Sequence, residues 1–224
     1  PAGVDREGKP TAQTTVEDFM SRFETSLSRL QMNYVDILYI HDISNIELLE
    51  HKQLLNAVNR LKKEGRIKFL GFSTHRNEAL VIDHAASMNT YDVILTSYNF
   101  RHGSLPDLNN SIKKAAAAGI GIVAMKTLAG GKGVNATAAI KWVLSNPDVH
   151  TTIPGMTAFN ELENNLKILS DITLNEQEKN DVLIASAGPG LFCAGCNACV
   201  AGCTKHLPIP DLMRAYMYAY GYPN

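Results

Sequence analysis

The feature that most restricts the fold of this chain is a repeat of short apolar runs, each followed by a segment with a helical pattern. The runs are rich in β-branched residues and start about 30 residues apart. They cover residues 35–40, 67–72, 91–96, 120–125 and 150–153. Because they are mostly apolar without strict alternation, they suit strands that are buried on both faces of a parallel sheet. The sequence therefore predicts repeated βα units.

Helix signals fill the segments between these runs. Thr14 with Glu17, and Thr173 with Glu176, have the spacing of capping boxes. Gly65 is placed as the left-handed residue that ends a helix, after two lysines in its last turn. The predicted helices cover residues 14–30, 48–63, 77–88, 105–118, 135–145, 158–169 and 174–185.

Polar residues gather where the predicted strands end, which favours the mouth of a closed barrel over an open sheet. They are His41-Asp42, Ser73-Thr74, Ser97-Tyr98-Asn99, Lys126-Thr127 and Pro154-Gly155. No Gly-x-Gly-x-x-Gly follows the first run, which counts against a Rossmann fold. The fold class is therefore α/β, a (β/α)8 TIM barrel. Such a barrel takes about 250 residues and eight strands, so we expect an N-terminally incomplete barrel of about five βα units, trimmed or part of something longer.

Composition excludes several classes of function. The chain has 224 residues with 21 Lys and Arg against 22 Asp and Glu, a formal net charge of -1. No basic stripe is present, so nucleic acid is not an expected partner. No apolar run approaches the ~20 residues of a membrane span, so no membrane association is expected.

All four cysteines lie within one short segment, as Cys193-x-x-Cys196-x-x-Cys199-x-x-x-Cys203. This is the spacing of a ferredoxin-type [4Fe–4S] run, with a four-thiolate zinc site as the alternative. Thr204 stands where Pro is usual, and in two-cluster ferredoxins the fourth Cys serves the other cluster, so ligation by Cys203 is open. Clustered rather than scattered cysteines indicate a reducing, cytoplasmic setting.

Several strand-end segments resemble the aldo/keto reductase family. They are residues 35–41, 65–73 and 119–126, followed by Ile153-Pro154-Gly155 and Glu163-Asn164-Asn165. The resemblance covers about residues 14–170 in order, and it implies a TIM barrel. The cysteine segment resembles the ferredoxin-like tail that follows the barrel in a bacterial subgroup of this family.

The resemblance implies that a nicotinamide cofactor gives hydride to a carbonyl, a Tyr donates the proton, and an Asp, a Lys and a His tune that Tyr. His41 matches the family's catalytic His, and an imidazole there can orient the carbonyl oxygen. The Asp, Tyr and Lys belong to the first three βα units, which precede residue 1 in the alignment, so this chain alone is expected to be catalytically incomplete. Tyr34 and Tyr39 are expected to pack rather than to replace the catalytic Tyr.

The resemblance also implies a set of cofactor-binding residues. These are Ser73 at the nicotinamide, Lys126, Leu128, Gly130 and Gly131 at the pyrophosphate, Gly155 and Thr157 at a phosphate, and Asn164 and Asn165 at the adenine. The usual Asn and Gln beside the carboxamide are replaced by Thr74 and Leu95. Glu161 would repel a 2′-phosphate, so NADH is favoured over NADPH.

Two domains are expected: a partial aldo/keto reductase barrel over 1–172, and a C-terminal helix with the cysteine tail over 173–224. The last helix of the C-terminal segment, over 211–220, is expected to pack on the barrel through Leu212, Tyr216, Met217 and Tyr220. The expected function is NAD(P)H-dependent reduction of a small-molecule aldehyde or ketone, with an Fe–S centre in the tail. The alternative is a non-catalytic Fe–S or zinc binding module. An electron-transfer partner and a homo-oligomer are left open.

Overall fold

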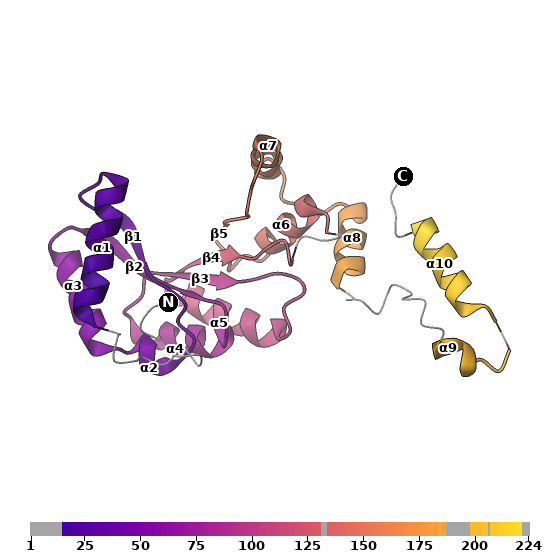
Figure 1. Ribbon diagram of the computed structural model, residues 1–224, viewed down its shortest axis with the longest axis horizontal. Helices are drawn as coiled ribbons and strands as arrows, with labels where there is room; N and C mark the ends of the chain where they lie inside the picture. Colours follow the sequence, from indigo (N-terminus) through magenta and orange to yellow (C-terminus); the bar gives the residue numbers. More distant parts are fainter. Residues whose placement is uncertain (1–14, 131–133, 187–197, 206, 221–224) are drawn as a thin grey trace.

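The computed structural model describes residues 15–130, 134–186, 198–205 and 207–220 (Figure 1). Its centre is a five-stranded, wholly parallel sheet with the strand order β1-β2-β3-β4-β5. The strands are β1 (Val35–Ile40), β2 (Ile67–Thr74), β3 (Val93–Ser97), β4 (Gly121–Met125) and β5 (Thr151–Thr152). Since each strand pairs with the next along the chain, all their carboxyl ends lie at one edge of the sheet, as predicted.

One helix precedes β1, others occupy the connections between the strands, and further helices follow β5. They are α1 (Val16–Leu30), α2 (Ile46–Leu49), α3 (Lys52–Lys63), α4 (Glu78–Met88), α5 (Leu105–Ala117), α6 (Ala136–Leu144), α7 (Phe159–Ile168), α8 (Glu176–Ser186), α9 (Ala198–Ala201) and α10 (Ile209–Tyr220). Strand and helix alternate as the apolar periodicity predicts.

The two faces of the sheet differ in burial. On the face turned toward the helices, Phe72, Ile94 and Ile122 are completely buried in the main hydrophobic core. On the opposite face, Phe69 is 47% exposed and Ile37 is 37% exposed. A parallel sheet normally has both faces covered. Five strands with helices on one side and an open inner face are consistent with part of a TIM barrel.

Helix ends follow the predicted glycine stops, whereas the capping box before α8 is displaced. Gly65 has a φ of 69°, and the N–H of Arg66 donates to Leu61 O (2.9 Å), which closes a Schellman-type turn. At the start of α1, Thr15 accepts the N–H of Asp18, and Thr14 of the predicted box lies outside the described residues. Before α8 the reciprocal pair is Asn175 with Glu178, so the box predicted at Thr173 and Glu176 is wrong.

Three element boundaries also differ from the prediction. The helix expected over 48–63 is divided, because the His51 side chain accepts the N–H of Leu54 and begins α3 there. Strand β3 begins only at Val93, because Tyr91 is buried in the helix layer with its hydroxyl donating to Leu49 O (2.7 Å). Strand β5 is limited to Thr151–Thr152.

The tail does not pack as predicted. Figure 1 shows α9 and α10 apart from the sheet and its helices. Leu212 and Tyr216 on α10 are 53% and 60% exposed, so neither packs on the barrel. The side chains of Met217 and Tyr220 lie outside the described residues.

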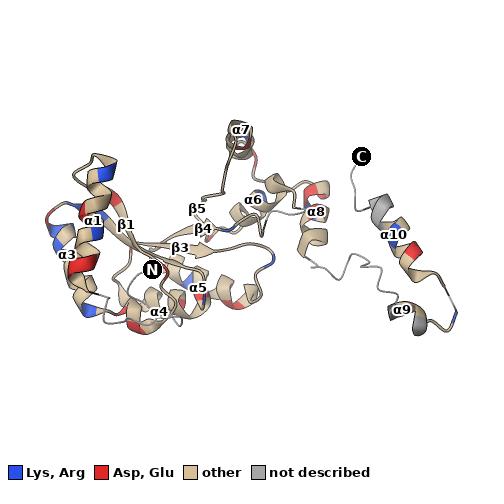
Figure 2. Cartoon of the chain, in the orientation of Figure 1, with Lys and Arg blue, Asp and Glu red and all other residues tan. Residues whose placement is uncertain are grey.

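Charged side chains of both signs occur on the described surface. Figure 2 shows Lys and Arg beside Asp and Glu on α1, whereas α3 carries Lys and Arg without an acidic residue. Arg66 pairs with Glu24 at 2.8 Å, and Lys68 with Asp36 at 2.6 Å. No helix in the described ranges is long and apolar enough to span a bilayer.

Candidate active site

The site begins where β1 and β2 end side by side. Tyr39 is in register with Gly71 and Ile40 with Phe72, so His41 lies level with Ser73. The N–H of Asp42, directly after His41, donates to Ser73 Oγ at 3.0 Å. The register and this bond place the predicted catalytic His41 beside the predicted cofactor residue Ser73.

Neither tyrosine near β1 reaches this edge. Tyr39 lies one layer below His41, and its ring covers Gly71, where a Cβ would come within 2.7 Å of Tyr39 Cε1. Burial raises the pKa of the Tyr39 hydroxyl. Tyr34 precedes β1 at the opposite edge, where the Lys68 ammonium lies 5.1 Å from its ring centroid. The predicted packing role fits Tyr39, whereas Tyr34 is exposed.

Backbone strain is concentrated at the carboxyl ends of the strands. Six described non-glycine residues have positive φ angles. Gln31 and Asn89 end helices, whereas Asp42, Asn77, Lys126 and Ala129, with φ angles of 48° to 59°, lie in the loops after β1, β2 and β4. Such conformations are costly unless the surroundings impose them, and they cluster at functional sites.

The buried polar atoms without partners also lie at this edge. In the described part of the chain they are Asp42 Oδ1 and Thr127 Oγ1, which follow β1 and β4. Unpaired buried groups are rare in folded proteins. The positive φ angles and the unpaired buried oxygens thus occur together at the edge formed by the carboxyl ends of the strands, which makes this edge the candidate ligand site. We call this edge the rim.

The loop after β4 is tied firmly to its neighbours. Lys126 is exposed, and its carbonyl accepts from Asn99 Nδ2 at 3.1 Å. Arg101 donates to Ala129 O (3.0 Å) and to Ala185 O at the end of α8 (2.7 Å). The backbone of the predicted phosphate loop is therefore held in place by the loop after β3.

The remaining residues predicted for this loop divide into three cases. Leu128 is half-buried and packs in a second apolar cluster against α6 and α8, so its side chain serves the core. Gly130 is exposed with a φ of 94°, a conformation that glycine adopts without strain. Gly131 lies outside the described residues.

An imidazole that the sequence analysis did not assign, His75, follows β2 at the rim. Its ring centroid lies 6.1 Å from that of His41, with the ring planes at 62°. Burial lowers the pKa of His75, and the charges of Lys126 and His41 lower it further, whereas Asp42 opposes these effects. Groups from the ends of β1, β2 and β4 thus act on one another electrostatically.

At the end of β5, a carboxylate occupies the amides that were predicted to hold a phosphate. Gly155 and Thr157 are exposed before α7. Glu161 Oε2 accepts the N–H of Thr157 (2.6 Å) and of Ala158 (3.0 Å). These bonds lower the pKa of Glu161. A dinucleotide phosphate at this turn would have to displace the Glu161 carboxylate.

The other predicted contacts are placed as follows. Asn164 is exposed on α7, where it accepts from Lys167 Nζ at 3.4 Å, and the neighbouring Asn165 is half-buried. Ser73 is only 3% exposed. Thr74 is fully buried, and its hydroxyl donates to Arg76 O, so it cannot take the place of the family's carboxamide-binding Asn.

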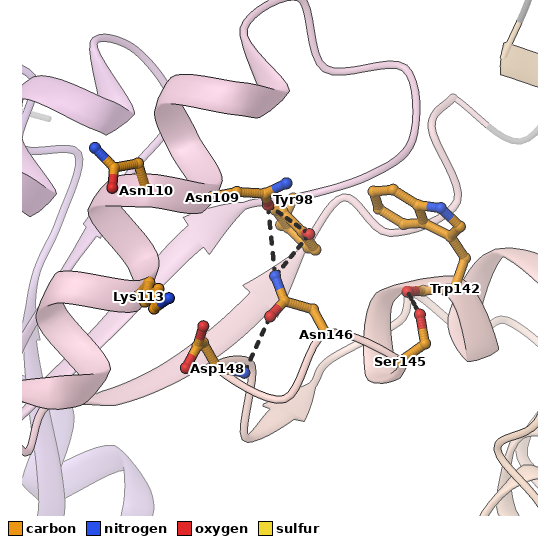
Figure 3. A pocket seen from close by; sticks show the side chains of 8 residues that line it. All are labelled: Tyr98, Asn109, Asn110, Lys113, Trp142, Ser145, Asn146 and Asp148. Atoms are coloured by element: carbon orange, nitrogen blue, oxygen red, sulfur yellow. Dashed lines mark hydrogen bonds between the residues drawn. The ribbon is translucent and has the colours of Figure 1, made fainter.

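A cavity of about 370 Å³ lies between α5 and α6, and it is also lined by Tyr98, which directly follows β3 (Figure 3). At its base, the Tyr98 hydroxyl donates to Asn109 Oδ1 (2.7 Å) and accepts from Asn146 Nδ2 (2.8 Å). The Tyr98 ring stacks on Trp142 at 5.3 Å. Because the hydrogen-bonding groups of Tyr98, Asn109 and Asn146 are paired with one another, we assign this cavity to the packing of α5 and α6 rather than to the reaction site. No local sequence pattern pointed to it.

The cysteine motif is only partly described. Cys193 and Cys196 lie outside the described residues. Cys199 is exposed on α9, and Cys203 Sγ accepts the N–H of Leu207 at 3.5 Å. The described ranges contain no cluster of three or more potential metal ligands.

Two curated proteins are similar in sequence to this chain. The chain is 25% identical over 194 residues to L-galactose dehydrogenase of Arabidopsis thaliana, covering 70% of this chain and 60% of that protein. It is 27% identical over 113 residues to the aldo-keto reductase AFTS1 of Alternaria alternata, covering 49% and 30%. The chain therefore spans at most 60% of the length of these curated relatives.

Solved structures show the same fold. Aldo-keto reductase AKR11C1 from Bacillus halodurans, in its holo form, aligns with a TM-score of 0.59 and 17% identity, covering 73% of this chain and 65% of that one. An aldo-keto reductase from Pseudomonas aeruginosa aligns with a TM-score of 0.59 and 22% identity, covering 76% and 63%. The sequence model of the Aldo/keto reductase family matches residues 4–137. This chain belongs to the aldo/keto reductase family.

Proposed function

We propose that the protein is an NAD(P)H-dependent oxidoreductase that reduces an aldehyde or ketone by hydride transfer. The observation that carries this proposal is the rim, where His41, Ser73 and Lys126 end three strands of one sheet. Catalytic groups of TIM-barrel enzymes lie at this end of the strands. The strained backbone and the unpaired Asp42 and Thr127 oxygens support a ligand site there.

His41 has the position and exposure to act on a carbonyl. It ends β1 on the open inner face, and no structural hydrogen bond within the described residues engages its ring. An imidazole N–H there donates to the carbonyl oxygen, orients it and stabilises the negative charge that develops on it. The nicotinamide cofactor would supply the hydride when it is bound. The proton that completes the alcohol would come from the family's catalytic Tyr, which neither Tyr34 nor Tyr39 replaces.

The cofactor-binding residues would follow the same edge. Ser73 lies beside His41, and the loop of Lys126, Leu128, Gly130 and Gly131 follows β4. Gly155 and Thr157 follow β5, with Asn164 and Asn165 on α7. Glu161 favours NADH, because its carboxylate occupies the amides before α7 and would repel a 2′-phosphate.

Calorimetry with NADH and with NADPH tests this proposal. We expect NADH to bind more tightly than NADPH. Glu161→Gln should improve NADPH binding relative to NADH by roughly two- to fivefold, the effect of one charge near a helix N-terminus. Glu163→Gln is the matched control, because Glu163 is exposed on the same helix and should leave the ratio unchanged.

The outcomes separate the two parts of the proposal. The oxidoreductase function is contradicted if the protein binds neither NADH nor NADPH and oxidises neither of them when an aldehyde is added. An unchanged NADH to NADPH ratio in Glu161→Gln contradicts only the preference assigned to Glu161.

We also propose that Cys193, Cys196, Cys199 and Cys203 hold a [4Fe–4S] cluster, with zinc as the alternative metal. The sequence spacing suits a cluster, and the N–H of Leu207 on Cys203 Sγ is the kind of hydrogen bond that tunes cluster thiolates. A cluster would supply one-electron chemistry, so an electron-transfer partner would accompany it.

Spectroscopy with metal analysis tests the cluster. Anaerobically purified protein should contain iron and sulfide and show broad visible absorption that bleaches with dithionite. Cys203→Ser should lower the iron content if Cys203 is a ligand, whereas Ser186→Ala, outside the motif, should not. A colourless preparation that contains zinc contradicts the cluster. Iron without dinucleotide binding would instead favour the non-catalytic binding module.

A further inference from the structure

A second imidazole faces the space beside His41. His75 lies one residue beyond the end of β2, two positions after Ser73. Side chains alternate along a strand, so this spacing continues the face that carries Phe69, Gly71 and Ser73. The ring lies edge-on to His41, with centroids 6.1 Å apart. Neighbouring strands thus bring two imidazoles to one side of the rim.

His41 and His75 differ from the other described histidines in the hydrogen bonding of their ring nitrogens. In the described part of the chain, four further histidines each form a hydrogen bond that serves the fold. They are His51 to Leu54, His84 to Glu50, His102 to Ser104 and His150 to Ile122. No such bond is formed by the rings of His41 and His75. His41 is exposed and His75 is half-buried. Since no hydrogen bond with another described residue engages either ring, both are available to bind a ligand.

Charged groups from three directions face His75. Asp42 and His41 approach from the end of β1, Lys126 from the end of β4, and Glu78 from the first turn of α4. Asp42 pairs with Arg76 through Oδ2 at 3.3 Å, while its buried Oδ1 has no partner. Burial lowers the pKa of His75, Lys126 and His41 lower it further, and the carboxylates of Asp42 and Glu78 oppose these effects. A neutral imidazole donates one N–H and accepts at its other nitrogen.

We infer that His75 is a second substrate-contacting residue, which donates an N–H to the substrate oxygen from the end of β2 while His41 donates from the end of the neighbouring β1. This inference rests on the proposed carbonyl reduction. It follows from the shared face, the short distance between the rings and the absence of any structural bond at either ring. No proton is transferred by His75 in this role, since it acts as a hydrogen-bond donor to the oxygen that gains negative charge.

Substitutions at His75 test the inference by steady-state kinetics with 4-nitrobenzaldehyde and saturating NADH. His75→Phe keeps a ring of similar size and removes both nitrogens, and it should lower kcat/KM by about tenfold, the loss of one hydrogen bond to the substrate. His75→Asn keeps a donor and should recover part of that loss. NADH affinity should stay unchanged in both. His84→Phe, a surface histidine on α4, is the matched control and should leave turnover unchanged.

A measurement on the unmutated protein covers the case in which a variant fails to fold. In NMR spectra of the NAD⁺ complex, the His75 ring protons should shift on addition of 4-nitrobenzaldehyde, and those of His84 should not. Unchanged kinetics in a folded His75→Phe protein, or an unmoved His75 resonance, overturns the inference. Failure of the wild-type protein to bind any dinucleotide would overturn the proposed function instead.

Discussion

Replacing Lys141 by methionine is expected to lower the free energy of unfolding by about 3 to 5 kcal/mol, the cost of leaving one member of a buried ion pair without its partner. Lys141 on α6 and Glu178 on α8 are 9% and 8% exposed. Lys141 Nζ lies 3.0 Å from Glu178 Oε1 and donates to Thr173 O at 3.1 Å. Methionine fills a similar volume but leaves the buried Glu178 carboxylate without its charge partner. Urea denaturation followed by circular dichroism measures the loss.

A double variant separates the lost charge partner from lost packing. Lys141→Met combined with Glu178→Gln should recover most of the stability, because a neutral amide at 178 still accepts the N–H of Asn175. Lys179→Met is the control, since its pair with Glu176 is exposed and worth less than about 1 kcal/mol. A Lys141→Met protein as stable as Lys179→Met would show that the buried pair does not hold α8.

The same ion pair matters for the rim because α8 is connected to the phosphate loop. Arg101 donates to Ala185 O in α8 and to Ala129 O in the loop after β4. Detaching α8 removes one of the two acceptors that fix the Arg101 side chain. We therefore expect Lys141→Met to weaken dinucleotide binding although Lys141 does not lie at the rim. The double variant should restore that binding.

Features set by local chemistry were predictable from the sequence, whereas those set by tertiary partners were not. Gly65 ends a helix because its left-handed φ angle suits glycine, and this stop was predicted. The box before α8 was assigned to Thr173 and Glu176, but Glu178 takes that role because its carboxylate also pairs with Lys141 of α6. No local pattern contains that partner.

The same division applies to the rim. His41, Ser73 and Lys126 were predictable because each follows an apolar run, and parallel strands bring such positions to one edge. The role of Asp42 depends on a left-handed turn and a buried oxygen, which the sequence does not reveal. His75 did leave a signal, since it lies two residues after Ser73 and alternation places it on the same face.

The prediction for the α10 side chains failed for a related reason. An apolar stripe shows that a helix has a face to bury, but it does not identify the surface that covers it. Leu212 and Tyr216 form such a stripe and remain exposed. Only long-range contacts could have decided where that face lies.

Replacing His41 by alanine is expected to lower kcat/KM for carbonyl reduction by roughly 100- to 1000-fold, the usual cost of removing a donor to a developing oxyanion. His41 is exposed, and within the described residues its ring forms no hydrogen bond that holds the fold. Stability should therefore change by less than about 0.5 kcal/mol. NADH affinity should be unchanged, because the predicted cofactor contacts lie on other strands. Steady-state kinetics and calorimetry on the same preparation measure both quantities.

Tyr39→Phe decides whether the effect belongs to His41 or to the hydroxyl beneath it. The Tyr39 ring packs over Gly71, one layer below the rim, and burial raises the pKa of its hydroxyl. Removing that hydroxyl should leave turnover unchanged, because the group lies too deep to meet the substrate. If Tyr39→Phe abolished reduction while His41→Ala did not, the proton donor would be Tyr39, and the carbonyl would have to bind lower in the open face than the rim places it.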